Sequence, residues 1–376
     1  MGWRYLAQRL TGDGLGEFIG EVPLRSVGIT DTLSGPTGLT GTVSPKTMQL
    51  IGDDGRPLLE NWGTAIWAEE SGLIRGGGIL VHRGIAGPEL SLECAGFTSY
   101  PKDMPYTDSW FGVEIDPLDV VRHIWEHLQS KPGGNLGLQV SNVMTGLKIG
   151  VELEQVEFDT QEGPVSFEAG PVKLAWYQTH DLGGEIDTLA ADTPFDYHEW
   201  HQWAANGENQ LEHFLDFGYP RLGNRRADLR FVIGENVFLV PSVEDTGEDY
   251  ANETLVLGAG EGRTMLRGGA AVNDGRLRRV KTTEDKSLRS LVSVNALAKR
   301  LLAWSSGIGD SVTEITVRNH HHAPLGSWQV GDDIRVQGEA GWTEVDQWAR
   351  VLSSTMSPES GDAAVLTISR VDKVTA

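Results

Sequence analysis

The sequence predicts a mainly β protein that contains smaller α+β segments. Short apolar runs are separated by glycine-containing turns, and 47 of the 376 residues are glycine. Only two longer stretches have the spacing of an amphipathic helix. Strands joined by tight turns are therefore expected to dominate, and a chain of this length is expected to form about two to four domains.

Residues 1–113 are predicted to form a β-module. Turn signals at 12–14, 53–55 and 71–72 separate apolar runs and favour hairpins. A barrel or a sandwich is the natural closure of such a set of strands. The expected strands cover residues 3–10, 18–22, 26–30, 38–43, 64–69, 73–82 and 89–97.

A helix is predicted over residues 116–129. Asp116 is a good N-cap, Pro117 suits the first helical position, and Asp119 adds negative charge to the first turn. The pattern ends in the lysine, proline and glycines of 131–134. One buried face is expected, formed by Val120, Val121, Ile124 and Leu128.

The same helix carries His123, Glu126 and His127, an H-x-x-E-H arrangement. Histidines four residues apart lie on one helical face, so both imidazoles can reach one zinc ion with Glu126 beside them as general base. A five-residue pattern also arises by chance, and no second helix with a clear third ligand follows. We therefore predict two solvated histidines on a polar face and assign no catalytic, cofactor or metal residue, with a zinc-dependent peptidase as the alternative.

Residues 114–208 are predicted to form a small α+β domain that the helix opens. Strands are expected over 136–140, 151–158 and 172–179, with loops at 132–134 and 183–184. The aromatic stretch 193–203 follows. It contains His198, Glu199 and His201, which fit either a metal or acid–base site or, as we favour, a buried aromatic cluster at a domain junction.

The C-terminal part is predicted to return to strands around a second helix over 285–304. Arg221, Arg225, Arg226 and Arg230 form a basic patch, which suits a partner's carboxylates and local salt bridges about equally. Three consecutive histidines at 320–322 are interpreted as a loop, because adjacent residues converge poorly on one ion. The clearest strands cover 211–217, 228–233, 237–240, 253–257, 314–318, 332–337, 343–352 and 363–371.

The charge balance argues against a protein that wraps nucleic acid. Lys and Arg total 31 against 53 Asp and Glu, which gives a formal net charge of −22, whereas phosphate binding needs a basic surface. The single cysteine, Cys94, is expected to be a buried thiol, and an intramolecular disulfide is impossible. No signal segment and no apolar run approaching 18 residues is present, so a soluble protein made in a reducing cytoplasm is expected.

Several motifs occur in an order that is more specific than any one of them, from about residue 24 to 373: TLSGPTGLTGTVSP, DDGRPLLENWGTAIWAEE, ECAGFTSYP, DPLDVVRHIWEHLQSKPGG, FDYHEWHQW, LDFGYPRLGNRRADLRFVIGENV and APLGSWQVGDDIRVQG. In this order they resemble the minor tail proteins of long, non-contractile-tailed phages of actinobacteria. These proteins belong to a baseplate-hub-like family, related in fold to the trimeric hubs at the tips of other phage tails.

The resemblance implies a homotrimer at the tail tip in which each subunit carries two tail-tube-like antiparallel β-barrels, so that three subunits continue a hexameric tube. It implies a first barrel up to 113, an α+β domain over 114–208, a second, split barrel from 209–250 and 308–376, and an insertion at 251–307. Implied partners are the tail tube, the tape-measure protein and other minor tail or fibre proteins.

In this setting the protein is located in the virion, and in the host cytoplasm before assembly. Acidic residues facing the DNA exit path would repel passing genomic DNA without binding it. Two other classes of function stay open at this point. One is a cell-wall-active tail enzyme that uses His123, Glu126 and His127, and the other is a carbohydrate-binding tail module, which exposed coplanar tryptophans would favour.

Overall fold

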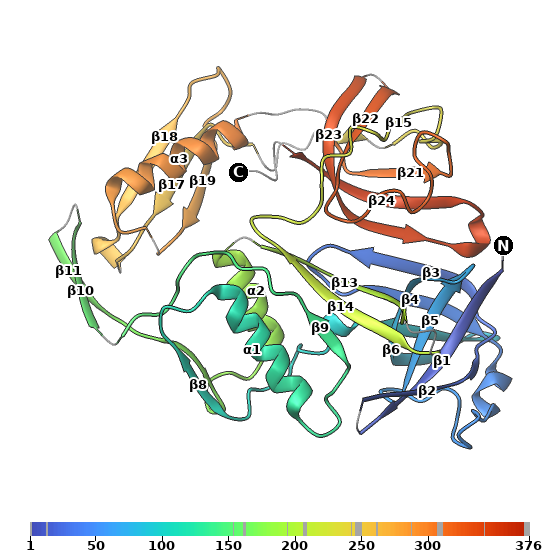
Figure 1. The fold of residues 1–376 in the computed structure, drawn as a ribbon. Helices are drawn as coiled ribbons and strands as arrows, with labels where there is room; N and C mark the ends of the chain where they lie inside the picture. Colours follow the sequence, from blue (N-terminus) through green and yellow to red (C-terminus); the bar gives the residue numbers. More distant parts are fainter. Residues whose placement is uncertain are drawn as a thin grey trace.

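The computed structural model describes residues 2–12, 14–152, 154–160, 163–193, 195–205, 209–241, 243–244, 250–260, 262–286, 288–306, 311–341 and 343–371. The architecture is mainly β (Figure 1). Within these residues, helices with the length and apolar character needed to cross a membrane are absent.

Half of the described strands belong to one twelve-stranded sheet (Figure 1). Its central path runs β15-β22-β23-β3-β4-β7-β6-β5-β1-β2, and β21 and β24 join it through β23. The N-terminal half is formed by β1 (Trp3–Thr11), β2 (Gly14–Glu21), β3 (Arg25–Thr32), β4 (Gly38–Val43), β5 (Thr64–Glu70), β6 (Leu73–Ala86) and β7 (Glu89–Ala95). The C-terminal β-block consists of β15 (Phe231–Val232), β21 (Glu314–Arg318), β22 (Asp333–Ala340), β23 (Thr343–Met356) and β24 (Ala363–Arg370).

Strand β5 is buried on both faces because its side chains alternate between two cores. Ala65 and Trp67 point into the core shared with the helical layer, whereas Ile66 and Ala68 point into the core of the N-terminal strands. Cys94 lies in this second core and is buried, as the sequence predicts. Burial raises the pKa of the Cys94 thiol, so it stays protonated and unreactive.

The expected closure of each β-block into its own barrel is wrong for the described residues, in which every sheet is open. Strand β3 pairs with β4 on one side and with β23 on the other, with Ile29 opposite Met356 and Thr32 opposite Ser353. To close the N-terminal strands into a barrel, the free edge of β3 would have to pair with β2. That edge pairs instead with β23, which lies more than 300 residues later in the sequence. One ladder of hydrogen bonds thus runs through both β-blocks, because pairing with β23 satisfies the exposed backbone groups of β3 as well as closure would.

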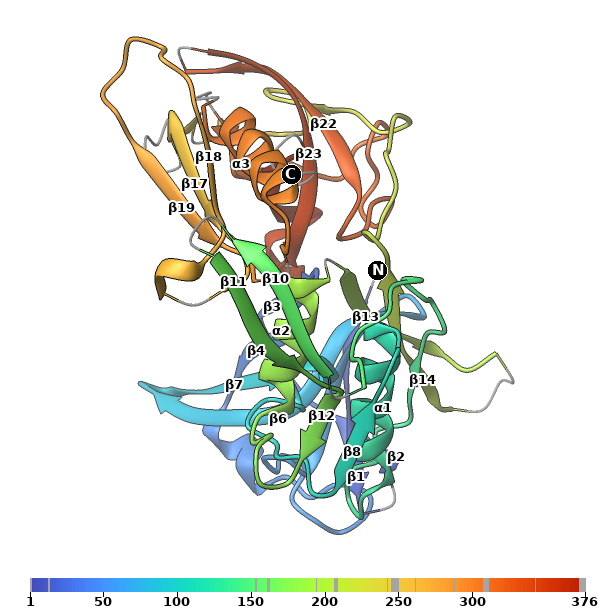
Figure 2. The ribbon, with the colours of Figure 1, turned by 90° about the vertical axis from the view of Figure 1, so that its left-hand side faces the viewer.

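A helical layer packs against one face of the N-terminal strands (Figures 1 and 2). Its helices are α1 (Pro117–Ser130) and α2 (Leu182–Asp192), and α1 confirms the helix expected over 116–129. The glycines expected as a loop at 183–184 lie instead in the first turn of α2, where a Cβ on Gly183 would meet Lys102 Cα at 3.0 Å. The neighbouring strands are β8 (Ser109–Gly112), β9 (Leu138–Val140), β10 (Glu154–Thr160), β11 (Gly163–Ala169), β12 (Val172–Ala175), β13 (Asp196–Trp203) and β14 (Leu211–Gly218).

Strand β14, whose residues the resemblance implies for the second barrel, pairs with strands of this helical layer. It pairs antiparallel with β13 and parallel with β9. Leu215 and Phe217 are buried in the same core as Trp125 of α1 and Trp67 of β5. The pairing partner of a strand is set by which core its apolar face meets, and its own residues do not specify that core.

The segment around residues 251–305 forms a small unit in which α3 (Leu291–Ser305) covers one face of a three-stranded sheet (Figure 2). Val256 packs against Val294 and Ala298 of α3. The helix expected over 285–304 begins six residues late, because Asp285 N–H donates to Leu257 O at 2.8 Å and continues the sheet. The unit contains β17 (Glu253–Leu257), β18 (Arg267–Ala271) and β19 (Val280–Glu284). Strands β16 (Val243–Glu244) and β20 (Ser311–Val312) pair with each other.

Short 3₁₀ turns complete the structure. They are η1 (Pro45–Gln49), η2 (Phe97–Ser99), η3 (Gly262–Thr264) and η4 (Pro358–Ser360).

Asp116 joins the start of α1 to the following loop, and its loss is expected to be costly. Its Oδ1 accepts from Leu118 N at 3.0 Å, and its Oδ2 accepts from Thr145 N, Thr145 Oγ1 and Gly146 N, each at 2.9 Å. Replacing Asp116 by Asn turns an amide NH₂ toward some of these donors, so the variant should lose about 2 kcal/mol in urea unfolding. The matched change Asp119→Asn, at a carboxylate that is 39% exposed and pairs with Arg122, should cost less than about 1 kcal/mol. Equal losses in the two variants would contradict this role of Asp116.

Candidate functional site

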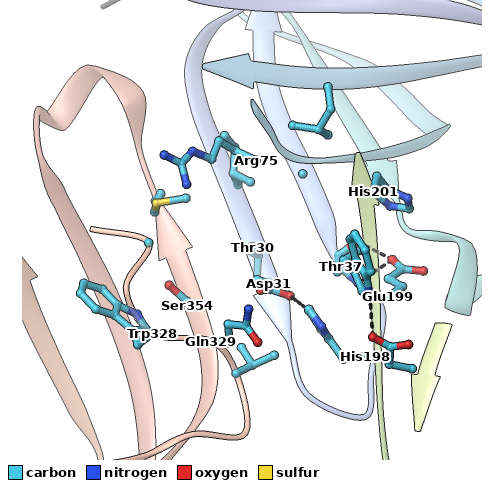
Figure 3. A pocket seen from close by; sticks show the side chains of 18 of the residues that line it. Thr30, Asp31, Thr37, Arg75, His198, Glu199, His201, Trp328, Gln329 and Ser354 are labelled. Atoms are coloured by element: carbon cyan, nitrogen blue, oxygen red, sulfur yellow. Dashed lines mark hydrogen bonds and ion pairs between the residues drawn. The ribbon is translucent and has the colours of Figure 1, made fainter. Parts of the chain in front are cut away.

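A pocket of about 460 Å³ lies where the N-terminal strands, β13 and the C-terminal β-block meet (Figure 3). We call it the seam pocket. Asp31 of β3 and His198 of β13 line one side, and Trp328 and Ser354 come from the C-terminal β-block (Figure 3). Segments far apart in sequence therefore supply its walls.

The ion pair between Asp31 and His198 joins β3 to β13 inside the seam pocket. His198 Nε2 lies 2.7 Å from Asp31 Oδ1. Burial by itself lowers the pKa of His198, but the hydrogen bond and charge of Asp31, with Glu199 and Asp216 nearby, outweigh it and raise the pKa above its ordinary value. His198 is thus protonated more readily here than in water.

Glu199 is buried and ties β13 to two loops of the N-terminal strands. Its carboxylate accepts from Thr37 Oγ1, from Thr37 N at 3.3 Å and from Thr98 N at 2.7 Å. Burial raises the pKa of this carboxyl group, although these hydrogen bonds act in the opposite direction. A Cβ on Gly96 would fall 1.6 Å from Glu199 Oε1, so only glycine permits this approach.

His201 and His213 form a buried pair beneath the pocket. Their Nδ1 atoms are 2.8 Å apart, and both rings lie against Trp67 and Phe97. Burial lowers the pKa of His213 to about 3 and holds that of His201 well below its ordinary value. Both imidazoles are therefore neutral at pH 7, and one must donate its Nδ1–H to the other.

A buried ion pair between Arg350 and Asp196 joins β13 to the C-terminal β-block. Arg350 of β23 binds Asp196 through its guanidinium and donates to Leu222 O at 2.7 Å and to Gly331 O at 3.2 Å. Asp196 also accepts from Leu222 N at 2.8 Å. The Arg350 side chain is only 4% exposed, so its charge is balanced inside the protein.

The polar groups in and around the seam pocket bind segments of the chain to one another. The aromatic-junction interpretation of 193–203 is confirmed: His201 lies in an aromatic cluster, and His198 and Glu199 bind groups on neighbouring segments. The sequence reasoning missed the Asp196–Arg350 and Asp31–His198 pairs, whose partners lie 154 and 167 residues apart. The one available signal was Arg350 itself, a charged residue between two apolar ones in a predicted strand.

His123 of the H-x-x-E-H motif is held by two aromatic residues. Its Nε2 lies 2.8 Å from Tyr106 Oη, and its ring stacks on Trp110 with the centroids 4.4 Å apart. Burial lowers its pKa. The expectation that His123 is solvated is therefore wrong, because Tyr106 and Trp110, just before the helix, cover this face.

His127 is buried and bonded separately. Thr107 N–H donates to His127 Nε2 at 3.3 Å. His127 Nδ1 lies 3.6 Å from Asp108 Oδ2. Burial, helped by the charge of Lys131, lowers the pKa of His127, whereas Glu126 is exposed. Within the described residues, the side chains of this H-x-x-E-H motif are not among those whose ligand atoms lie close enough together to hold one metal ion.

The side chains that do lie close enough are those of His320, His321 and His322. One ring nitrogen of each lies within 4.8 Å of the other two. The expectation that three adjacent histidines converge poorly is therefore wrong. The chain turns tightly here, with His320 bridged to Ala323, and the turn brings the three rings to one side.

The basic patch forms contacts within the chain. Arg221 pairs with Asp333 at 2.9 Å, and Arg226 pairs with Asp228 at 2.8 Å. The Arg225 guanidinium lies 3.9 Å from the centre of the Trp348 ring. Local pairing, one of the two interpretations of this patch, therefore accounts for these three arginines.

An exposed aromatic cluster lies on strand β8 and the turn that follows β12. Phe111, Trp176 and Tyr177 are 55%, 62% and 51% exposed, and Lys173 Nζ lies 4.8 Å from the Tyr177 ring centre. Trp176 meets Tyr177 edge-on, at an interplanar angle of 83°. Such a pair lacks the coplanar platform that favours a carbohydrate site, whereas solvent-facing aromatic groups are typical anchors of protein interfaces.

Solved structures with a similar fold include tail proteins, two of them from prophages. The 43 kDa tail protein of a Shewanella oneidensis prophage is 12% identical, with 98% of each chain covered and a TM-score of 0.63. A tail protein from Neisseria meningitidis is 15% identical over 97% of this chain and 96% of that one, with a TM-score of 0.56. A prophage tail protein from Listeria monocytogenes is 11% identical over 98% and 95%, with a TM-score of 0.54.

The protein thus has the fold of phage tail proteins over nearly its whole length. Neither a protein-family model nor a curated protein sequence matches the chain. The likeness therefore lies in the arrangement of elements, at sequence identities of 15% and below.

Proposed function

We propose that this chain is a structural, non-enzymatic tail protein that forms a homotrimeric hub at the tip of a long, non-contractile phage tail. The observation that carries the proposal is the fold shared from end to end with tail proteins, two of which come from prophages. The ordered motifs that resemble minor tail proteins of actinobacterial phages agree with it. In this proposal the N-terminal strands and the C-terminal β-block build the ring, held in register by the β3–β23 pairing.

The hub would join the hexameric tail tube and the tape-measure protein to other minor tail or fibre proteins. It would be located in the virion, after a period in the host cytoplasm before assembly. The formal net charge of −22 suits a ring through which DNA passes without adhering, since carboxylates repel phosphates. A cryo-EM map of the tail tip in which the channel wall is neutral or basic would contradict this part.

The oligomer is tested by native mass spectrometry of the untagged protein, alone and mixed with its neighbouring tail proteins. A trimer in either sample supports the hub. A monomer in both samples contradicts it. The same spectra record bound metal, so the peptidase alternative is tested as well: it requires one zinc per chain that is lost when His123 or His127 is replaced.

The exposed aromatic cluster on β8 and the turn after β12 is the surface we propose for contacts between subunits of the hub. Replacing Trp176 by Ala should weaken each subunit interface by about 2 kcal/mol, or about thirtyfold in the dissociation constant of one interface, as for an interface hot spot. Trp62 is a matched control, because it is 59% exposed against 62% for Trp176 but lies on another segment.

Sedimentation velocity over a dilution series provides the measurement. We expect Trp62→Ala to assemble like the unmodified protein. If Trp176→Ala assembles equally well, the cluster lies outside the ring interface and must contact another tail protein or solvent.

A further inference from the structure

The histidine turn at 320–322 has no role in the proposed hub. It follows β21 and places three imidazoles side by side, with ring centres 4.1 Å apart for His320 and His321 and 3.8 Å apart for His321 and His322. His320 and His322 are half-buried, so their rings have restricted freedom. A cluster of nitrogen ligands on one side of a turn is the first requirement for binding a transition-metal ion.

Glu235 adds a carboxylate oxygen from a different turn, the one that follows β15. Its Oε1 lies 3.5 Å from His320 Nε2 and 3.7 Å from His322 Nε2. These separations are long for hydrogen bonds. They agree with two ligands of one tetrahedral ion, which lie about 3.4 Å apart when each is about 2.1 Å from the metal.

The two turns are held in place without a metal. Arg318 N donates to Asn236 O at 2.9 Å, and the Arg318 side chain donates to Glu235 O at 2.7 Å. Arg230 N donates to His322 O at 3.2 Å. Because these bonds use backbone groups or side chains outside the cluster, the ligand atoms are brought together and stay available.

The two ring nitrogens of His320 have different neighbours. His322 N donates to His320 Nδ1 at 3.3 Å, whereas His320 Nε2 faces the Glu235 carboxylate at 3.5 Å. Nε2 is therefore the nitrogen placed to bind an ion, while Nδ1 already has a contact within the turn.

We propose that His320, His322 and Glu235 bind one zinc ion, with His321 placed as a further ligand. Two imidazoles and a carboxylate form a ligand set that zinc accepts in tetrahedral geometry. The ion would link the turn after β15 to the turn after β21 and so fasten one end of the C-terminal β-block (Figure 1). This site does not depend on the hub, because its ligands all lie in one chain.

The test is a titration of the untagged, chelator-stripped full-length protein with Zn²⁺ at pH 7.5, in competition with a chromogenic chelator. One ion per chain is expected with a Kd of about 1 µM or tighter. Glu235→Gln should weaken binding at least about tenfold, and the double variant His320→Gln, His322→Gln at least about a hundredfold. Glu339→Gln, at an exposed position on β22, is the matched control and should bind like the unmodified protein.

Dependence on Glu235 distinguishes a built site from a run of histidines that captures metal loosely. Equal affinity of the Glu235→Gln variant and the unmodified protein overturns the proposal, as does a Kd weaker than about 100 µM. A second readout is the midpoint of thermal unfolding. Zn²⁺ should raise it in the unmodified protein and in Glu339→Gln and leave it unchanged in the double histidine variant, because only a bound ion stabilises the folded state.

Discussion

An Arg350→Met variant is expected to lose about 3–5 kcal/mol of unfolding free energy. Methionine keeps the length of the side chain but leaves the Asp196 carboxylate without its buried partner. The Leu222 and Gly331 carbonyls lose a donor as well. Because these groups lie between β13 and β23, the loss should appear in urea unfolding as weaker attachment of the C-terminal β-block.

The matched control is Arg335→Met on the neighbouring strand β22. Arg335 also binds a carboxylate, that of Asp346, with both bonds at 2.7 Å, but the two side chains are 44% and 49% exposed. A solvent-exposed pair contributes little to stability, so this variant should unfold at nearly the same urea concentration as the unmodified protein. Adding Asp196→Asn to Arg350→Met should recover part of the loss. Equal destabilisation by Arg350→Met and Arg335→Met would show that burial of the pair is not what matters.

The protein is expected to lose stability steeply in acid because of His201 and His213. The pKa of each is lowered in the folded state, to about 3 for His213, while the unfolded chain binds these protons near pH 6.5. The unfolded state therefore holds more protons as the pH falls below 6.5. Below pH 6.5, each histidine should lower the free energy of unfolding by about 1.4 kcal/mol for every unit by which the pH falls. For His213 this loss continues down to about pH 3.

The measurement is urea unfolding at several pH values between 7 and 4, with the slope of stability against pH as the readout. Replacing both histidines by Phe should remove their part of the slope, whatever its effect at pH 7. The pKa of Glu199 is raised in the folded state, so Glu199 contributes to the slope of stability against pH with the opposite sign. Because Glu199 is present in all samples, its contribution cancels in the comparison. An unchanged slope in the double variant would contradict neutral burial of the pair.

His198 provides a control of opposite sign. Its pKa is raised, so its contribution is fully present below pH 6.5 and is lost only as the pH rises through its folded-state pKa. His198→Asn should therefore lower stability at pH 6 but leave the slope between pH 6 and 4 as it is.

Features that depend on near neighbours could be predicted from the sequence. The cap at Asp116, the proline at the first helical position and the apolar spacing locate α1 to within one residue at each end. The mainly β character, the buried Cys94 and the aromatic junction at β13 follow equally from local patterns. In α3 the same reasoning found the apolar stripe and missed the start, because Asp285 is drawn into the sheet by a backbone bond to Leu257.

Features that join distant segments needed the tertiary structure. Every strand offers the same backbone donors and acceptors along its edge, so nothing in 25–32 specifies pairing with β23 in place of barrel closure. The Asp196–Arg350 pair and the approach of Glu235 to the histidine turn likewise depend on where the chain returns. The sequence by itself determined the elements and their buried faces, since these follow from local sterics and periodicity. Only the tertiary structure decided which edges and charges meet, because those contacts are chosen by the packing of the whole chain.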